Sequence, residues 1–397
     1  MQICTERLET PCFVIHSAIL DESFKDFFSC VKKYQNKAIL SYSYKTNYYP
    51  AVLKCAYNNH FWAEVTSPDE YYLAKEMGHN KDIIYNGPNK DRDSFLNAIN
   101  EGCIVNIDSN REIEWLKLLD TSCKYKVGIR VNFHLNNYCD EYNEMEMISR
   151  FGFSYEDGEL RDAIARIQKN ANVKVCYFHM QKCGNSRSVN IYRGIIRAAC
   201  IIAEKCGVNL EYIDVGGGFK LGVYEDLTTD NYMKHMIEEL HHHNLTNVGI
   251  ILEPGNSLVY SSIDYVTKII DLKKIGNNNF VVVDGSRIHI DPLFRRKEYL
   301  SIEVKTDRCY NTIDNISEWM ICGCTCKETD RIAKIRAFSL EIDDDIWIKK
   351  VGAYTMSMLS RFVTSLPTVY IEDHNNYTKD FYKRNLYEME WFEGGEI

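Results

Sequence analysis

The chain has 397 residues, 45% of them hydrophobic, which suits two domains with substantial cores. Its formal net charge of -9 argues against a general nucleic-acid binder. No apolar run is long enough to cross a bilayer, and the N-terminal residues lack the layout of a signal peptide. The 15 cysteines are scattered and odd in number, as is typical of reduced thiols. We therefore expect a cytoplasmic, soluble protein that binds neither membrane nor nucleic acid.

Between about residues 26 and 265, short apolar runs alternate with segments of helical period. Residues 11–15 form a separate strand-like run before this region. The strand-like runs are Ile104–Ile107, Tyr125–Val131, Val173–Phe178, Tyr212–Val215 and Val248–Leu252. Helical period is clearest over Asp69–Met77, Glu112–Leu119 and Asn190–Lys205. This alternation predicts a parallel sheet, and the number of repeats favours a (β/α)8 TIM-like barrel.

The pattern changes after about residue 265. Strand-like runs then follow one another without helices between them, at Val266–Leu272, Phe280–Asp284, Ala337–Ile342 and Ile346–Val351. Such a run predicts a mainly antiparallel β domain. We therefore expect an α/β plus β protein: a barrel domain over residues 26–265, and a β-barrel or sandwich domain formed by residues 1–25 and 266–397.

Lys45 ends the strand-like run Ser41–Tyr44, and a helical pattern begins soon after it at Ala51. In a β/α barrel this position lies on the face that carries the chemistry. A lysine amine there can form a Schiff base with a carbonyl group, pyridoxal phosphate included. A solvated surface charge is the simpler interpretation of one lysine after one strand.

Three further motifs follow predicted barrel strands. Gly216, Gly217 and Gly218 let backbone N–H groups approach an anion, or simply form a tight turn. Glu253, in Glu-Pro-Gly-Asn, could hold a pyridine nitrogen protonated, or be an ordinary solvated acid. His179 could stack on a flat cofactor or shuttle protons, or be a satisfied rim histidine.

The β-rich part carries two candidates. Cys322, Cys324 and Cys326 alternate, so an extended chain would place their thiols on one face; without a second ligand pair we expect no metal there. The more specific alternative to a metal site is a thiol that donates a proton during catalysis. Tyr354 follows a strand and can donate to a phosphate oxygen, or be a half-buried strand residue.

Taken in this order, the motifs resemble the fold-type III pyridoxal-phosphate decarboxylases, the family of diaminopimelate, ornithine and arginine-type decarboxylases, whose barrel is alanine racemase-like. The resemblance covers about residues 10 to 390 and implies a pyridoxal 5'-phosphate cofactor. It implies Lys45 as the Schiff-base lysine, Glu253 as the acid on the pyridine nitrogen, and Cys326 as the proton donor from a neighbouring subunit. The other cofactor-site residues that it implies are Glu64, Arg130, His179, Gly216, Gly217, Gly218, Gly255 and Tyr354, and Asn256 lies at a further position of the family's cofactor site.

The chain departs from this family at several positions. Asn256 stands where the family has arginine after Glu-Pro-Gly, and Gln181-Lys182 begins the segment where the family has a Gly-Ser pair. We hypothesise that Lys182 supplies the missing positive charge to the phosphate. Asp291 takes the place of a substrate-gripping arginine, and Lys327 follows the cysteine where the family favours an acid.

These observations predict a decarboxylase of an amino acid or amino-acid conjugate that releases an amine and CO2. Asp291, Lys327 and Tyr354 are the expected substrate contacts, and the swapped charges argue against strict diaminopimelate specificity. The resemblance also implies a homodimer with shared active sites and a role in amino-acid, polyamine or specialised-metabolite biosynthesis. An inactive regulatory or scaffold relative and an amino-acid racemase on the same fold are the alternatives.

Overall fold

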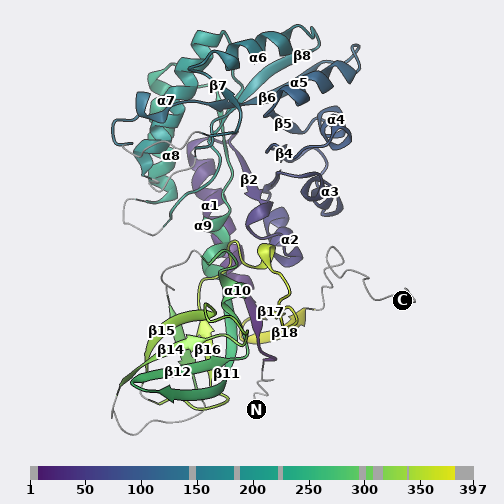
Figure 1. Cartoon of the computed structure of the whole chain (residues 1–397). Helices are drawn as coiled ribbons and strands as arrows, with labels where there is room; N and C mark the ends of the chain where they lie inside the picture. The colour runs from purple at the N-terminus through teal and green to yellow at the C-terminus, as the bar shows by residue number, and fades with distance from the viewer. Residues whose placement is uncertain are drawn as a thin grey trace, which may run out of the picture. The chain divides into compact units, whose positions relative to one another are not determined.

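The computed structural model describes residues 8–142, 149–182, 188–221, 227–294, 301–306, 316–337 and 339–380. The chain divides into two compact units. One is Leu20–Tyr260, and the other combines Met1–Ile19 with Ser261–Ile397 (Figure 1). We call them the barrel unit and the β-rich unit and describe each by itself.

The barrel unit is built on a ring of eight parallel strands. The order is β5-β4-β3-β2-β10-β9-β8-β6, and a β5–β6 pairing closes the ring, while β7 (Phe153–Ser154) pairs with β6 outside it. The prediction of a closed parallel barrel is confirmed. The eight strands are β2 (Ile39–Ser43), β3 (Trp62–Val65), β4 (Ile83–Tyr85), β5 (Ile104–Ile107), β6 (Tyr125–Asn132), β8 (Val173–His179), β9 (Tyr212–Asp214) and β10 (Gly249–Leu252).

Helices follow the strands and surround the ring (Figure 1). Their starts are set by capping side chains: Ser67, Asp91, Ser109 and Thr228 each accept a hydrogen bond from a backbone N–H of the first turn. The helices are α1 (Ser17–Tyr34), α2 (Pro50–Asn58), α3 (Pro68–Glu76), α4 (Arg92–Asn100), α5 (Asn110–Trp115), α6 (Glu159–Gln168), α7 (Val189–Cys206), α8 (Thr229–His242) and α9 (Asn256–Val259).

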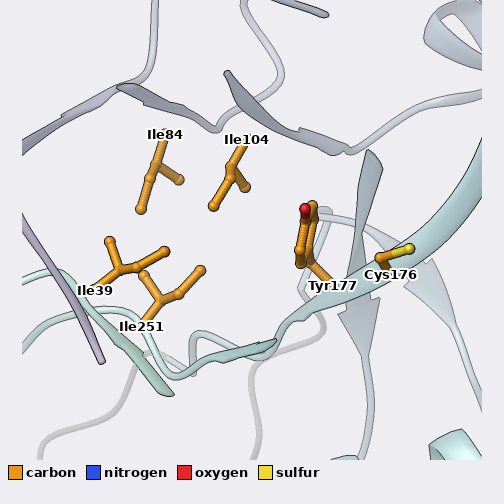
Figure 2. Packing of buried hydrophobic residues seen from close by; sticks show 6 residues of the cluster. All are labelled: Ile39, Ile84, Ile104, Cys176, Tyr177 and Ile251. Carbon is orange, nitrogen blue, oxygen red and sulfur yellow. The ribbon is translucent and has the colours of Figure 1, made fainter. Parts of the chain in front are cut away.

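An apolar layer fills the barrel below the carboxyl ends of its strands. Ile39, Ile84, Ile104 and Ile251 point toward one another from four strands, with Tyr177 beside them (Figure 2). Trp62 and Tyr212 pack against this cluster from two more strands. The layer makes the barrel a packed core rather than a pore, so that chemistry is confined to its end.

The β-rich unit is mainly antiparallel, as predicted. The path runs β15-β14-β12-β11-β1-β17-β18, and β16 joins β11 to β13. Strand β1 is antiparallel to β11 and parallel to β17, so the N-terminal strand lies inside this sheet. The strands are β1 (Cys12–His16), β11 (Ile263–Ile275), β12 (Asn278–Val283), β13 (Ile302–Lys305), β14 (Ser317–Cys322), β15 (Arg331–Ala337), β16 (Asp345–Ile348), β17 (Thr368–Asp373) and β18 (Asn376–Asp380).

The expected strand over Ala337–Ile342 is wrong in position. Strand β15 ends at Ala337, and Glu341 and Asp344 form a turn, in which the Glu341 N–H donates to the Asp344 carboxylate, before β16. A short helix, α10 (Arg287–Ile290), also interrupts a region expected to hold strands alone. Among the described helices, none combines the length and hydropathy that a membrane crossing requires.

Candidate active site

Polar side chains gather at the carboxyl ends of the barrel strands. Each of them lies two residues after a member of the apolar layer on the same strand. Because side chains alternate along a strand, both residues point into the barrel, and the polar one lies nearer the carboxyl end. The pairs are Trp62 and Glu64, Ile84 and Asn86, Ile104 and Asn106, Tyr177 and His179, Tyr212 and Asp214, and Ile251 and Glu253. All six polar residues of this layer are buried.

Lys45 lies in the 3-10 turn η1 (Tyr44–Thr46) that follows β2, as the sequence predicted. Its ammonium group forms an ion pair with Glu64, which also accepts a hydrogen bond from Ser43 Oγ. Burial opposes ionisation of Glu64, but the charge of Lys45 and these hydrogen bonds lower its pKa. The Lys45 side chain is 42% exposed, so a fixed, ionised carboxylate holds an amine that a small molecule can reach.

Glu253, Asp214 and His179 form a compact buried group, in which one polar atom from each side chain lies within 4.8 Å of those from the other two. Burial, and then the charges of Asp214 and Glu64, raise the pKa of Glu253 well above its ordinary value. Burial raises the pKa of Asp214 to about 7. Burial and the charges of Arg130 and Lys45 lower the pKa of His179 far enough to keep its ring neutral.

Two asparagines connect the acids. Asn86 Nδ2 donates to Glu253 at 2.6 Å and to Glu64 at 3.2 Å, while its carbonyl oxygen accepts from Asn106 Nδ2 at 2.8 Å. Asn106 Nδ2 also donates to Asp214 at 3.4 Å. Asn106 fills the space beside Gly128, where a Cβ would lie 1.7 Å from its oxygen.

The glycine turn after β9 is held from two sides. Gly216 and Gly218 have φ of +70° and +92°, a region that favours glycine. The Gly217 N–H donates to Gln181 Oε1 at 2.8 Å, and a Cβ on Gly216 would collide with the same side chain. Gln181 therefore occupies a backbone cradle that suits an anion.

The remaining barrel candidates lie near strand ends. Lys182 Nζ lies 4.7 Å from the centre of the Phe133 ring. Arg130, in β6, is 3.8 Å from the Asp108 carboxylate and packs on Phe151. Gly255 approaches Thr46 so closely that a Cβ would lie 2.1 Å from its hydroxyl, and Asn256 is exposed at the start of α9.

In the β-rich unit, Cys326 is exposed on a loop between β14 and β15. Buried Asp330 holds this loop by accepting hydrogen bonds from Thr325, Ser286 Oγ and the Arg287 N–H. The ammonium group of Lys327 lies 5.2 Å from the Phe294 ring and 5.6 Å from the Phe362 ring.

Asp291 and Tyr354 also belong to the β-rich unit. The Asp291 carboxylate is buried and ion-paired with Arg287 at 2.7 Å. Tyr354 is 44% exposed and has a φ of +55°, an uncommon backbone state for a tyrosine. Arg295 and Arg296, two further cations close to Asp291 in the sequence, lie outside the described residues.

Sequence reasoning missed several residues that the fold brings into the site. Asn86 and Asn106 belong to no motif identified from the sequence, Asp214 appeared only within the strand-like run Tyr212–Val215, and Gln181 only in the segment that differs from the family. The two-residue spacing from an apolar strand position is a signal that identifies Asn86, Asn106 and Asp214.

Comparison with known proteins shows the family of the chain. Residues 20–260 match the family described as "Pyridoxal-dependent decarboxylase, pyridoxal binding domain". Diaminopimelate decarboxylase of Aquifex aeolicus is 25% identical over 365 residues, which cover 89% of this chain and 84% of that protein.

Solved structures share the fold. Diaminopimelate decarboxylase of Helicobacter pylori, complexed with L-lysine, matches with a TM-score of 0.80 and 21% identity over 94% of both chains. Arginine decarboxylase of Paramecium bursaria Chlorella virus matches with a TM-score of 0.76 and 18% identity, over 92% of this chain and 96% of that one. With a family match over most of the chain and a buried acid layer facing one lysine, the chain belongs to the pyridoxal-dependent decarboxylases, and it is a pyridoxal-phosphate-dependent carboxy-lyase.

Proposed function

We propose that the enzyme decarboxylates an amino acid whose distal end carries a carboxylate, alone or beside an amine, with Lys45 as the cofactor-binding lysine. The observation that carries this proposal is the arrangement of one reachable amine, a buried acid layer and a glycine cradle at one end of the barrel. The distal specificity rests on the charges of the β-rich unit.

The residues fit pyridoxal phosphate. Among the described residues, neither ring nitrogen of buried His179 has a hydrogen-bond partner, as suits a flat neutral ring that stacks on another. Glu253 is a buried acid that can face a pyridine nitrogen, and the Gly216–Gly218 turn offers backbone N–H groups to a phosphate. Lys45, Glu64, Arg130, Tyr354, Gly255 and Asn256 complete the proposed cofactor contacts.

When bound, pyridoxal phosphate supplies an electron sink for the pair left by the breaking carbon–carboxylate bond. Glu64 orients Lys45 and, as a carboxylate, can accept the proton that the Lys45 ammonium group must give up before its amine acts as a nucleophile. Glu253 holds a proton at the pyridine nitrogen. His179 is neutral and adds no positive charge to the site.

We propose that Cys326 of the partner subunit protonates the α-carbon, so that the active unit is a homodimer with shared sites. The thiol proton forms the new C–H bond, and the thiolate regains its proton from solvent. The exposed position of Cys326 on a loop held by Asp330 supports this role, because an exposed thiol on a fixed loop can meet another surface.

The substrate proposal comes from charge. Lys327 presents a cation beside Cys326 and over two aromatic rings, whereas the charge of Asp291 is already balanced by Arg287. A distal carboxylate is therefore favoured over a distal amine alone. Tyr354 and Asp291 are retained as proposed substrate contacts.

Lys182 is the proposed substitute for the family arginine at the phosphate. Lys182→Ala is expected to weaken cofactor binding roughly tenfold, the effect of removing one charge-assisted contact, whereas Lys182→Arg should keep it. Affinity is measured by titrating cofactor-free protein with pyridoxal phosphate. Equal affinity of Lys182→Ala and the wild type would exclude the role.

The two alternative functions lack support. The relatives and solved structures named above are all described as decarboxylases.

One experiment tests the proposal as a whole. Purified protein is given pyridoxal phosphate, its visible absorption is recorded, and a panel of amino acids with cationic, anionic and zwitterionic distal ends is screened for CO2 release. We expect a visible band and CO2 from members with a distal carboxylate, and neither from Lys45→Ala. Release of CO2 only from members with a distal amine would overturn the substrate proposal, and turnover by Lys45→Ala would overturn the site.

A further inference from the structure

Asp214 and Glu253 are two buried acids in direct contact. They come from neighbouring strands, with Asp214 at the end of β9 and Glu253 one residue after β10; a carboxyl oxygen of each lies within 4.8 Å of the other, and a side-chain hydrogen bond links the two groups. Asp214 is 0% and Glu253 is 5% exposed. Two carboxyl groups in contact away from water do not both ionise readily, so the pair shares a proton.

The surrounding donors decide which acid is charged. Asp214 accepts from the Gly216 N–H at 2.9 Å through Oδ1 and from Asn106 Nδ2 through Oδ2, so both of its oxygens face donors. Glu253 accepts from Asn86 Nδ2 through Oε1. Its other oxygen, Oε2, lies 3.9 Å from His179 Nε2. Because the His179 ring is neutral, it does not stabilise a negative charge on Glu253. Asp214 is thus better prepared to be the carboxylate, and Glu253 to be the acid.

We propose that Asp214 is a positioning residue that, held by Asn106 and the Gly216 N–H, keeps one proton on Glu253 for delivery to the pyridine nitrogen. This inference rests on the proposed role of Glu253. On cofactor binding, the proton leaves a Glu253 oxygen and bonds to the lone pair of the pyridine nitrogen. Glu253 becomes a carboxylate, and the new positive charge on the ring balances it.

Other charged groups face this pair from the elements around it. Glu64 of β3 adds negative charge, while Lys45 of η1 and Arg130 of β6 add positive charge, and His179 of β8 is neutral. Lys45 is already paired with Glu64. None of these groups changes in an Asp214→Asn variant, which removes one charge and keeps the shape of the side chain.

The test counts protons during cofactor binding. Wild type and Asp214→Asn are titrated with pyridoxal phosphate at pH 8 in two buffers of different ionisation enthalpy. In the variant, Glu253 loses the charge of Asp214, so its pKa falls and a larger fraction of it is ionised before the cofactor arrives, although burial and Glu64 still oppose ionisation. We expect the variant to take up more protons than the wild type, by up to one per site, and the alkaline fall of its cofactor affinity to begin at lower pH.

Equal proton uptake and coincident pH profiles would overturn the inference. Glu101→Gln, an acid-to-amide change at the exposed end of α4, is the control and should behave as the wild type. Circular dichroism establishes that each variant is folded. A role in packing alone would weaken the binding of the cofactor equally at every pH.

A second measurement needs no cofactor. Infrared spectra of the cofactor-free protein at pH 8 should contain a protonated-carboxyl band that loses intensity in both Asp214→Asn and Glu253→Gln. An undiminished band in both variants would overturn proton sharing. If wild type binds no pyridoxal phosphate, the proposed cofactor site fails, and the infrared result still decides whether the acids share a proton.

Discussion

At the scale of single residues, the site is defined by a spacing of two along six of the eight barrel strands. An apolar side chain fills the interior, and the next side chain on the same face is an acid, an amide or an imidazole. The apolar layer excludes water from one side of the polar residues. This low-dielectric surrounding strengthens the electrostatic interactions of the polar residues and shifts the pKa values of Asp214 and Glu253.

Gly128 is the residue that leaves room for this network. A Cβ at this position would lie 1.7 Å from Asn106 Oδ1, so Gly128→Ala must displace Asn106 from Asn86 and Asp214. We expect a loss of about 1–3 kcal/mol in the free energy of unfolding and a weaker affinity for pyridoxal phosphate. Urea unfolding and cofactor titration measure the two effects.

Gly102→Ala provides the matched control. Gly102 has a positive φ but no atom within 4 Å of an added Cβ. The control should lose some stability through backbone strain and keep the cofactor affinity of the wild type. Wild-type cofactor affinity in Gly128→Ala would contradict the proposed function of the asparagine pair.

At the scale of elements, one buried acid joins two helices of the barrel unit. Glu239 of α8 is buried and accepts hydrogen bonds from Arg193 and Arg197 of α7, at 2.8 and 2.7 Å. Burial opposes its ionisation, but these two arginines lower the pKa of Glu239 to about 2. A carboxylate with a depressed pKa stabilises the fold above its unfolded pKa and loses this effect as the pH falls.

Glu239→Gln is therefore expected to lower the free energy of unfolding at pH 7 by about 2 kcal/mol, less than for a fully enclosed pair because both arginines are partly exposed. The difference from wild type should shrink between pH 4.5 and the folded pKa of about 2. Urea unfolding of both proteins at pH 7 and pH 3.5 measures it. A difference that is equal at both pH values would contradict the ionic origin.

In the β-rich unit, a histidine has the opposite dependence on pH. His16 of β1 contacts Asp264 of β11 at 2.9 Å and Glu372 of β17 at 3.1 Å. The hydrogen bond to Asp264, in particular, raises the pKa of His16. Its contribution to stability is complete below the unfolded value of about 6.5 and is lost as the pH rises through the folded pKa.

His16→Gln should remove this dependence. Wild type should lose stability as the pH rises from 6.5 through the folded pKa of His16, and the variant should show a flatter profile over the same range. Hydrogen exchange of the β1 amides, followed against pH, reports the change at the strand itself. His374→Gln is the control, because His374 is exposed in the turn between β17 and β18. Parallel profiles of wild type and His16→Gln would contradict the prediction.

At the scale of the whole molecule, the proposed homodimer predicts complementation. Lys45→Ala and Cys326→Ala should each lose most decarboxylase activity. The first lacks the proposed cofactor-binding amine, and the second lacks the thiol proposed to protonate the α-carbon. If each site combines Lys45 of one subunit with Cys326 of the other, mixed dimers have one intact site. Mixing equal amounts under exchange should restore about one quarter of the wild-type activity. No recovery despite demonstrated exchange of subunits would place both residues in one chain.

The sequence predicts the architecture well because its signals are local. Alternating strand-like and helical periods indicated the barrel, and strand-end positions singled out Lys45, His179 and Glu253, whose positions the structure now describes. The pairing of Gln181 with Gly217, 36 residues apart, depends on the fold, and no periodicity in the sequence indicates it. Arg287 and Asp291 are four residues apart, but their pairing requires the short helix α10, which the sequence analysis did not predict. The misplaced strand at Ala337–Ile342 followed an alternation that a turn at Glu341 and Asp344 interrupts.

The closure of the barrel by β5 and β6 restricts where the chain can accept insertions and deletions. Every barrel strand is paired on both sides, so a deletion inside one of them cannot be absorbed by sliding the strand. Losing one residue between Tyr177 and His179 would turn the imidazole toward the surrounding helices. Insertions and deletions that keep decarboxylase activity should therefore fall between helices and strands. Point substitutions in the apolar layer of the barrel should be tolerated far more often.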